Sequence, residues 1–306
     1  MAIEIRPLQD HHIPEADRIF RLAFGTFLGL PDPMGFAPGA DFIGTRWRAE
    51  PHVVTLGAFD GDTLIGSNQV TRWGTFGFFG PLTVRPEDWG KSIAQRLLDP
   101  TMEVFARWGV RDAGLFTFPQ SPKHLALYQK YDFWPQHLTP LMARPVTANP
   151  ATPPAFAGSR DELIAQARSV TEAACPGIDV SGEIAAILDQ GLGEVVTVAD
   201  GDGLAAFAVC HVGRGTEAGD GAGYIKFAAA RPGAKAAFAS LIAASEAAAA
   251  RAGAQVLIAG VNTACHDAYR TMLDLGFRTQ FTGVAMQRGN RPGYFSPSAL
   301  VLGDWR

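Results

Sequence analysis

The sequence predicts a mixed α/β (α+β) protein made of two domains of the same kind. Its 306 residues exceed one average domain, since domains hold roughly 150 residues. Apolar segments with the character of strands alternate with segments of helical periodicity, which predicts a mixed fold. Landmarks of the first half also recur in the second half at a nearly constant spacing, and this recurrence predicts two copies of one unit.

The composition excludes several classes of protein. Glycine and proline, 34 and 21 residues, are too few for a disordered or low-complexity chain. The 26 basic and 30 acidic side chains form no basic block, so nucleic acid is not an expected partner. Neither a signal core nor a membrane span is recognisable, and we expect a cytoplasmic protein without a membrane partner. Three scattered cysteines predict neither a disulfide framework nor a metal site.

The elements of the first half are expected in a strand-rich order. They are a strand at 3–5, a helix from Pro14, a Gly/Pro-rich loop at 25–39, a short helix at 41–48, strands at 53–59, 64–75 and 78–84, a helix at 91–108, a strand at 113–118 and a helix at 122–130. Proline is tolerated in the first turn of a helix, and Asp60-Gly61-Asp62 has the composition of a turn. Pro100 predicts a kink or break in its helix. Strand, helix and strand in succession predict a right-handed parallel crossover.

The recurring landmarks lie at two offsets. Asp60-Gly61-Asp62 returns as Asp200-Gly201-Asp202, 140 residues later. Three others return after 144 residues: Leu97 as Leu241, Gly109 as Gly253, and Phe133 as Phe277. Each match alone is weak because glycines and apolar residues are common. Three matches at one offset favour a repeated domain.

The segment 144–158 has the composition of a linker, with four prolines and no acidic residue. We therefore expect a first domain at 1–143, this linker, a second domain at 159–290 and a tail at 291–306. Within the tail, 299–302 is expected to add an edge strand or to cross to the first domain. Trp305 would anchor it.

The stretch 80–98 carries the strongest functional signal. An extended segment ends at Val84, small residues follow at Gly90, Ser92 and Ala94, and a helix begins. Small side chains let an anion approach the unpaired N–H groups of a helix start, where the helix dipole favours negative charge. We interpret this stretch as a pyrophosphate site. It is not a Walker loop, which would require glycine at Arg85.

This stretch resembles the cofactor loop of the GNAT superfamily of acyl-CoA-dependent N-acyltransferases. In that family Val-x-Pro precedes the pattern Q/R-x-x-G-x-G/A, and here Val84-Arg85-Pro86 precedes the segment 89–94. Trp89 replaces the Gln or Arg and Ser92 replaces the Gly, whereas Ala94 fits. The resemblance implies acetyl-CoA as a cosubstrate, held by these residues: Leu82, Thr83, Val84, Trp89, Gly90, Lys91, Ser92, Ile93, Ala94 and Ser121.

A second family feature is a helix of the pattern N-x-x-A-x-x-L-Y-x-x-x-G-F. The segment 121–133 matches it at three positions: Leu127, Tyr128 and Phe133. It departs from it at three others: Ser121 for Asn, His124 for Ala and Asp132 for Gly. By this resemblance Tyr128 is the catalytic residue, a general acid for the departing thiolate. The role is chemically reasonable, because amine attack on a thioester expels a sulfur anion.

The resemblance also implies the fold and the activity. Each half would be a GNAT-like domain, a mixed and mostly antiparallel sheet flanked by helices. The expected activity is N-acetyl transfer from acetyl-CoA to a primary amine of a small molecule by direct attack, without a metal. A homodimer is a further expectation. The alternative is a non-catalytic module that senses acyl-CoA or scaffolds a partner.

The second half lacks the proposed acid. The offset of 144 maps Tyr128 onto Met272, and the other register, at 141, aligns Tyr269 but not the following phenylalanine. The segment 232–241 also spans nine steps where 86–97 spans eleven, so two residues are missing where the phosphate loop would lie. The second domain is therefore expected to be a degenerate copy.

The acceptor side is less determined. No general base stands out; Asp32, Asp41 and Glu87 are candidates, and a chain of water molecules is another. His124 lies one turn before Tyr128; contact with the same site is one interpretation, and a packed or solvent-facing residue is the preferred one. The Gly/Pro-rich loop and an aromatic run predict an acceptor cleft with apolar walls, the run being Trp73, Phe76, Phe78 and Phe79.

Overall fold

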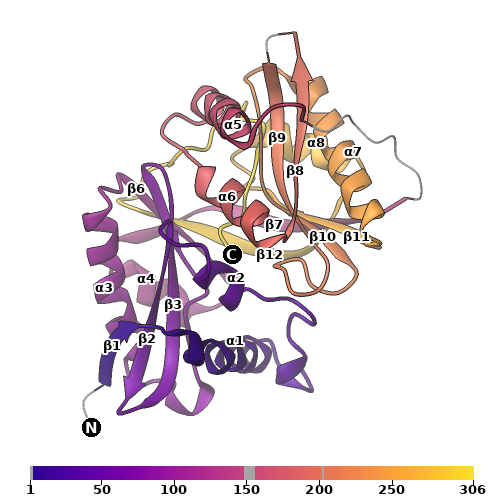
Figure 1. Ribbon diagram of the computed structural model, residues 1–306. Coiled ribbons are helices and arrows are strands. Elements are labelled where there is room, and N and C mark those ends of the chain that lie inside the picture. The colour runs from indigo at the N-terminus through magenta and orange to yellow at the C-terminus, as the bar shows by residue number, and fades with distance from the viewer. Residues whose placement is uncertain (1–2, 148–155, 202) are drawn as a thin grey trace.

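A single mixed sheet of thirteen strands runs through the protein, and helices pack on it (Figure 1). A computed structural model describes residues 3–147, 156–201 and 203–306. The expected linker at 144–158 therefore lies largely outside the described residues. Within them, no helix is both long enough and apolar enough to cross a membrane.

The first half contains seven strands and four α-helices in the described part. They are β1 (Ile3–Pro7), α1 (Ile13–Phe27), α2 (Ile43–Trp47), β2 (Val53–Asp60), β3 (Thr63–Trp73), β4 (Phe76–Phe79), β5 (Thr83–Val84), α3 (Ile93–Arg107), β6 (Asp112–Thr117), α4 (Pro122–Gln129) and β7 (Phe133–Pro145). β7 thus extends two residues into the segment expected to be a linker. Short 3-10 turns lie at Asp10–His12, Pro33–Gly35 and Pro86–Asp88.

The second half follows with a similar order of elements. They are α5 (Arg160–Ala174), α6 (Ser181–Gln190), β8 (Gly193–Asp200), β9 (Gly203–Val212), β10 (Ala222–Ala230), α7 (Lys235–Arg251), β11 (Val256–Gly260), α8 (His266–Asp274), β12 (Arg278–Arg288) and β13 (Val301–Leu302). β4 and β6 pair in parallel, as do β10 and β11. Each parallel pair is connected by a helix, α3 or α7, as the crossover rule requires.

The two halves exchange their long last strands. The order across the sheet is β1-β2-β3-β4-β6-β12-β7-β11-β10-β9-β8. β12 of the second half therefore pairs with β6 of the first, and β7 of the first pairs with β11 of the second. β7 and β12 also pair with each other along almost their whole length, and they lie between the two halves in Figure 1. The sheet is consequently continuous across the boundary between the two halves, which we call the seam.

Two expected elements differ from the structure. The strand expected at 78–84 is divided into β4 and β5, because Pro81 has no N–H for the ladder and Gly80 has a φ of 137°. α3 is not broken at Pro100 but continues to Arg107. Its apolar face, which includes Leu97 and Phe105, is buried in the core and holds the helix together despite the missing hydrogen bond.

Three residues of the aromatic run belong to the core rather than to a cleft wall. Trp73, Phe76 and Phe78 pack in the large core of the second half, and the ring of Trp73 meets that of Phe227 edge to face with centroids 5.3 Å apart. Their placement corrects the expectation of an acceptor cleft at these positions. The exchange of strands brings the end of β3 and β4 against the second half, so these rings bury the seam. Phe79 alone among the four lines a pocket.

Candidate functional site

The sheet opens where β4 and β6 part. The two strands pair from Phe76 to Phe79, and β6 then continues while the other chain bends and resumes as β5. In the described sheet β5 pairs only with β3, so its other edge faces the opening. Leu82, Thr83 and Val84 lie at this edge. The side chains of Thr83 and Val84 are buried, so it is their backbone that faces the opening.

The start of α3, where the sequence predicted an anion cradle, lies beside β5. Arg96 donates the first helical hydrogen bond, to the carbonyl of Ser92, so the N–H groups of 93–95 precede the ladder. Ile93 buries its side chain and offers only its backbone. A Cβ built at Gly90 would meet no atom within 4 Å, so the space before the helix is open. Unpaired N–H groups, helix dipole and open space together fit a diphosphate.

Ser92 explains why the family pattern has glycine at this position. Its φ is 60°, in the left-handed region that glycine adopts without steric cost. The same is true of Asp132, which replaces the other family glycine and has a φ of 67°. Both departures from the family therefore keep the backbone conformation. The structure retains the loop geometry although the glycines are gone.

Trp89 and Lys91 make contacts that shape the cradle from outside. The Trp89 indole donates a 2.7 Å hydrogen bond to the carbonyl of Val84, and its ring is 45% exposed. Lys91 donates to Asp88 at 2.7 Å, and Arg85 also pairs with Asp88. Burial alone would raise the pKa of Asp88, but hydrogen bonds from Arg85 and Lys91 outweigh it and lower that pKa. These contacts tie β5 to the loop that leads into α3.

Tyr128 lies at the other side of the opening, on α4. Its ring is buried, with the centroid 5.7 Å from that of Phe79. Burial raises the pKa of its hydroxyl, and a hydrogen bond with Thr117 at the end of β6 partly offsets this. Tyr128 is therefore a neutral phenol at physiological pH. Ser121 caps the same helix by accepting the N–H of His124 at 3.5 Å, so its hydroxyl has a structural contact.

A pocket of about 580 Å³ lies at this opening, and its described lining includes no residue of 83–96. Leu82, Phe79 and Tyr128 line it at the opening of the sheet. Further aromatic walls come from the first half, from α1, the loop after it and β6: Phe20, Phe24, Phe36, Phe42, Phe116 and Phe118. The expectation of apolar walls thus holds for this pocket, although most of the rings are not those of the run at 73–79.

His124 packs among aromatic rings, in agreement with one of its interpretations from sequence, and it also lines this pocket. Its ring centroid lies 6.4 Å from that of Tyr128 and 5.0 Å from that of Phe27. Burial, with the nearby Lys123 charge as a smaller cause, lowers the pKa of its imidazole. The spacing of four residues to Tyr128 was the available signal, because side chains four apart share a helix face.

The second half also contributes residues to this pocket, and no sequence motif predicted them. Phe281, Trp305, Glu217 and Arg306 line it. Strand exchange brings β12 beside β6, and the tail crosses to the first half, so these residues arrive from far along the chain. No local sequence pattern predicts these four residues, because their place in the pocket depends on which strands and segments pack together.

The three candidate bases lie elsewhere in the described structure. Asp32 accepts the N–H of Met34 in an exposed turn, and Asp41 accepts the N–H of Gly44 at 2.6 Å. Glu87 is largely exposed and 3.6 Å from Arg85. Among the described lining residues of the aromatic pocket, none of these carboxylates appears.

A buried network of charges supports the pocket from behind. Arg46 binds Glu217 through two hydrogen bonds of 3.0 and 2.6 Å and donates to the carbonyl of Gly80 at 2.9 Å. Lys226 bridges Glu217 and Glu183, at 2.6 and 2.9 Å. Burial would raise the pKa of Glu217, but Arg46 and Lys226 outweigh this and lower it far. The network therefore fixes the bend between β4 and β5 to the second half.

The tail fills the opening in the second half that corresponds to the one beside β5. β10 and β11 pair in parallel only as far as Ile225, after which they part. β13 then pairs with Ala228 and Ala229 of β10, and Gly303 donates to the carbonyl of Gly260 at the end of β11. Of the strand expected at 299–302, only Val301–Leu302 is present, and it lies in the opening rather than at an edge. Trp305 is buried beyond it.

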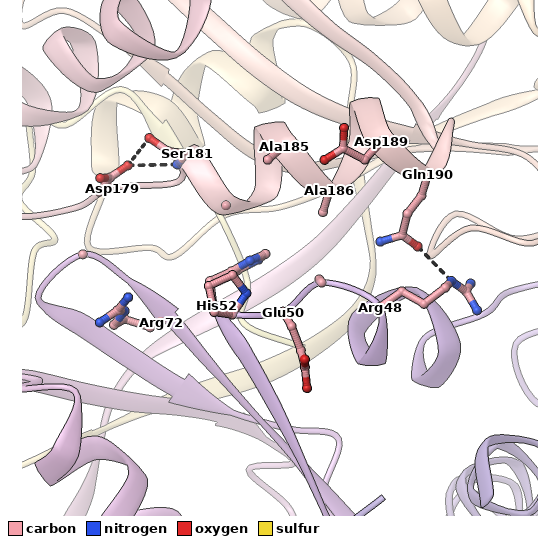
Figure 2. A pocket seen from close by; sticks show the side chains of 14 residues that line it. Arg48, Glu50, His52, Arg72, Asp179, Ser181, Ala185, Ala186, Asp189 and Gln190 are labelled. Carbon is pink, nitrogen blue, oxygen red and sulfur yellow. Dashed lines mark hydrogen bonds between the residues drawn. The ribbon is translucent and has the colours of Figure 1, made fainter. Parts of the chain in front are cut away.

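A second, polar pocket of about 480 Å³ lies at the seam, and Figure 2 shows its walls. The segment 48–52 forms one wall and α6 forms the other. Arg48 donates to Gln190 across it at 3.1 Å. Its acidic and basic side chains are mixed, and none of the predicted site residues lines the described pocket. In the described residues, no group of three or more His, Cys, Asp or Glu is arranged to hold a metal ion.

Comparison with known proteins identifies a domain in the first half. Residues 20–133 match the model of the acetyltransferase (GNAT) family. The match supports acyl transfer from an acyl-CoA as the general activity. A search of curated proteins found no match.

Solved structures share the fold over nearly the whole chain. A Pyrococcus horikoshii protein assigned as an acetyltransferase is 14% identical with a TM-score of 0.69, over 99% of this chain and 95% of that one. A GCN5-related N-acetyltransferase from Sphaerobacter thermophilus is 16% identical with a TM-score of 0.58, over 97% and 98%. At these identities the likeness concerns the fold.

Proposed function

We propose that the protein is an N-acetyltransferase that binds acetyl-CoA in its first half and transfers the acetyl group to a primary amine of a small molecule. The observation that carries this proposal is the opening of the sheet, which has the start of α3 and the open edge of β5 on one side and the neutral Tyr128, on the wall of the aromatic pocket, on the other. The family match over 20–133 supports it independently. When bound, acetyl-CoA would supply an activated thioester at the opening of the sheet.

The backbone of the cradle would hold the donor. The N–H groups of 93–95 and the loop at Gly90 to Ser92 would bind its diphosphate, and the free edge of β5 at 82–84 would bind its extended arm. Trp89, at the rim, would cover part of it. Because backbone groups do this work, the replacement of the family glycine by Ser92 is compatible with binding.

Tyr128 would act as the general acid. Tyr128 lines the aromatic pocket, and the thioester of a donor bound along β5 would lie beside it. As a neutral phenol, it would donate its proton to the sulfur when the amine displaces the thiol. Such positioned proton donors contribute typically 10² to 10⁴ in rate.

The pocket supports an acceptor with an apolar body. Aromatic rings from α1, the following loop and β6 form most of its walls. The charged groups that reach it, Glu217 among them, are engaged in the network with Arg46 and Lys226. A small amine on an aromatic or aliphatic body fits these walls better than a polycation or a sugar, because burying many polar groups against apolar rings is costly.

The second half would be a degenerate copy without a donor site. The matching order of elements supports duplication: β2 and β8 begin 140 residues apart, and β6 and β11 begin 144 apart. β13 lies where the donor arm would lie in that copy. Met272 stands in place of Tyr128 and is fully buried. The expected stoichiometry is one acetyl-CoA per chain.

Calorimetric titration with acetyl-CoA, followed by thiol detection with a panel of small amines, tests this function. We expect one site per chain in the wild type and at least tenfold weaker binding in Ser92→Trp, whose ring would fill the cradle. Ala236→Trp, at the exposed first turn of α7, is the matched control and should bind normally. Tyr128→Phe should bind acetyl-CoA but release thiol about 100-fold more slowly.

The outcomes separate the alternatives. Binding without thiol release from any amine would favour the acyl-CoA sensor. Absence of binding by the wild type would refute both functions, and two sites per chain would refute the assignment of the second half.

A further inference from the structure

His124 holds an unusual position in the pocket. It stands where the family helix pattern has alanine, one turn before Tyr128 and on the same face of α4. Its ring lies on the pocket wall between the aromatic side chains of Phe27 and Phe118, with centroid distances of 5.0 and 6.3 Å. An imidazole thus lies next to the proposed acid, on the side of the pocket that α1 closes.

The imidazole is not engaged elsewhere in the described structure. Its Nδ1 atom is buried and has no hydrogen-bond partner among the described residues. Most buried polar atoms have a partner, so an unpaired ring nitrogen within a pocket points to a group that binds there. A packing role alone would be served better by an apolar side chain at this position.

The groups around His124 leave it neutral. α1 and the loop after β6 contribute phenylalanine rings, and its own helix contributes Tyr128 and Lys123. The far walls of the pocket carry Glu217, Asp220 and Arg306, of which the first two pair with Arg46 and Arg214. Burial first, and Lys123 second, lower the pKa of the imidazole below its ordinary value of 6.5. At neutral pH it is therefore in the form that accepts a proton.

We propose that His124 is the general base of the reaction and removes a proton from the acceptor amine. This inference rests on the proposed acetyl transfer. His124 takes one proton from the ammonium, and the free amine then forms the nitrogen–carbon bond as the carbon–sulfur bond breaks. Tyr128 gives its proton to the sulfur and recovers one from the acylated nitrogen. His124 finally releases its proton to solvent, so one amide, one thiol and one proton are produced.

No other described group on the pocket wall fits this task as well. Glu217 is fully buried and bound by Arg46 and Lys226, which hold its carboxylate in the ionised state and occupy both oxygens. Asp220 pairs with Arg214 at 2.7 Å. Tyr128 is a neutral phenol and serves as a donor. His124 remains as the neutral acceptor beside the expected reaction centre.

The test compares His124→Gln, His124→Ala and a control, His137→Gln, whose ring is exposed on β7. With an amine that the wild type acetylates, we expect kcat/KM at pH 7.5 to fall about 100-fold in both His124 variants. The wild-type rate should rise through an ionisation below pH 6.5, and this limb should be absent in His124→Gln. Imidazole should restore part of the rate of His124→Ala, because that variant leaves space for it.

Two readouts do not depend on turnover. Nuclear magnetic resonance of the free wild type should show the His124 ring titrating below pH 6.5. Calorimetry should show acetyl-CoA binding within threefold of wild type for both His124 variants. A wild type without turnover would refute the proposed transfer together with this role. An active wild type whose rate and acid limb survive in His124→Gln would refute the role of His124 alone.

Discussion

At the scale of single residues, backbone conformation shows that the two departures from the GNAT patterns lie at positions whose geometry favours glycine. Ser92 and Asp132 stand at two glycine positions of the family patterns, and both have a positive φ. Gly276, the residue 144 positions after Asp132, has a φ of 87°. The second half thus keeps the glycine that the first has lost. A side chain at such a position carries a steric cost that the loop geometry imposes.

This cost predicts the effect of Ser92→Gly. Glycine enters the left-handed region freely, so the substitution should raise the free energy of unfolding by about 1 kcal/mol. Acetyl-CoA binding should be retained, since the N–H group of residue 92 remains. Urea denaturation and calorimetry measure the two effects.

Ser240→Gly provides the control for that prediction. Ser240 is exposed within α7, where glycine should destabilise by roughly 0.5 kcal/mol. If both glycine variants lost stability, the steric cost assigned to Ser92 would be contradicted.

At the scale of elements, the tail joins the two halves and completes the pocket. β13 occupies the opening between β10 and β11, and the chain then delivers Trp305 to the seam. The Trp305 indole donates to the hydroxyl of Tyr294 at 2.8 Å, and its ring centroid lies 4.7 Å from that of Phe76. The tail therefore fills the opening in the second half with β13 and forms part of the wall of the aromatic pocket with Trp305.

Trp305→Ala tests this double role. Loss of a buried ring should lower the free energy of unfolding by about 3 kcal/mol. Because Trp305 lines the aromatic pocket, the variant should also change KM for the amine and leave the affinity for acetyl-CoA unchanged. Denaturation, steady-state kinetics and calorimetry separate these effects. Unchanged stability together with unchanged KM would contradict the assigned position of the tail.

At the scale of the whole molecule, the exchange of β7 and β12 makes the halves interdependent. Each half contributes a strand to the sheet of the other, and the buried pair of Arg46 and Glu217 crosses the same seam. A duplicated chain without exchange would leave two separable domains. Here each half alone would expose the edge of β6 or of β11, which is a site for aggregation.

Cleavage of the connection between the halves tests the exchange. A protease site inserted between Thr147 and Phe156 should yield two fragments that elute together in native buffer and separate in denaturant. The reason is that the ladders of β7 and β12 persist without the covalent link. Size-exclusion chromatography before and after cleavage measures this. Separation of the fragments in native buffer would contradict the exchanged topology.

Local patterns in the sequence anticipated much of the fold and part of the site. The order of strands and helices in the first half, the loop that leads into α3, and the helix that carries Tyr128 all follow from turn residues, periodicity and short motifs. These signals are local because they reflect backbone geometry over a few residues. The break predicted at Pro100 was wrong because it also rested on a local signal. The hydrogen bond that Pro100 removes from the helix is outweighed by the burial of Leu97 and Phe105.

By itself, the sequence determined most of the strands and helices of the first half and that landmarks recur at 140 and 144 residues, and it predicted an anion cradle before α3. Only the tertiary structure decided that the last strands exchange, that Trp73 and Phe76 bury a seam, and that His124 and Arg306 reach one pocket. The physical reason is that helical and extended backbone depend on neighbouring residues. In contrast, which strand pairs with a given strand edge, and which residues contact a given aromatic ring, depends on packing between segments that are more than a hundred residues apart.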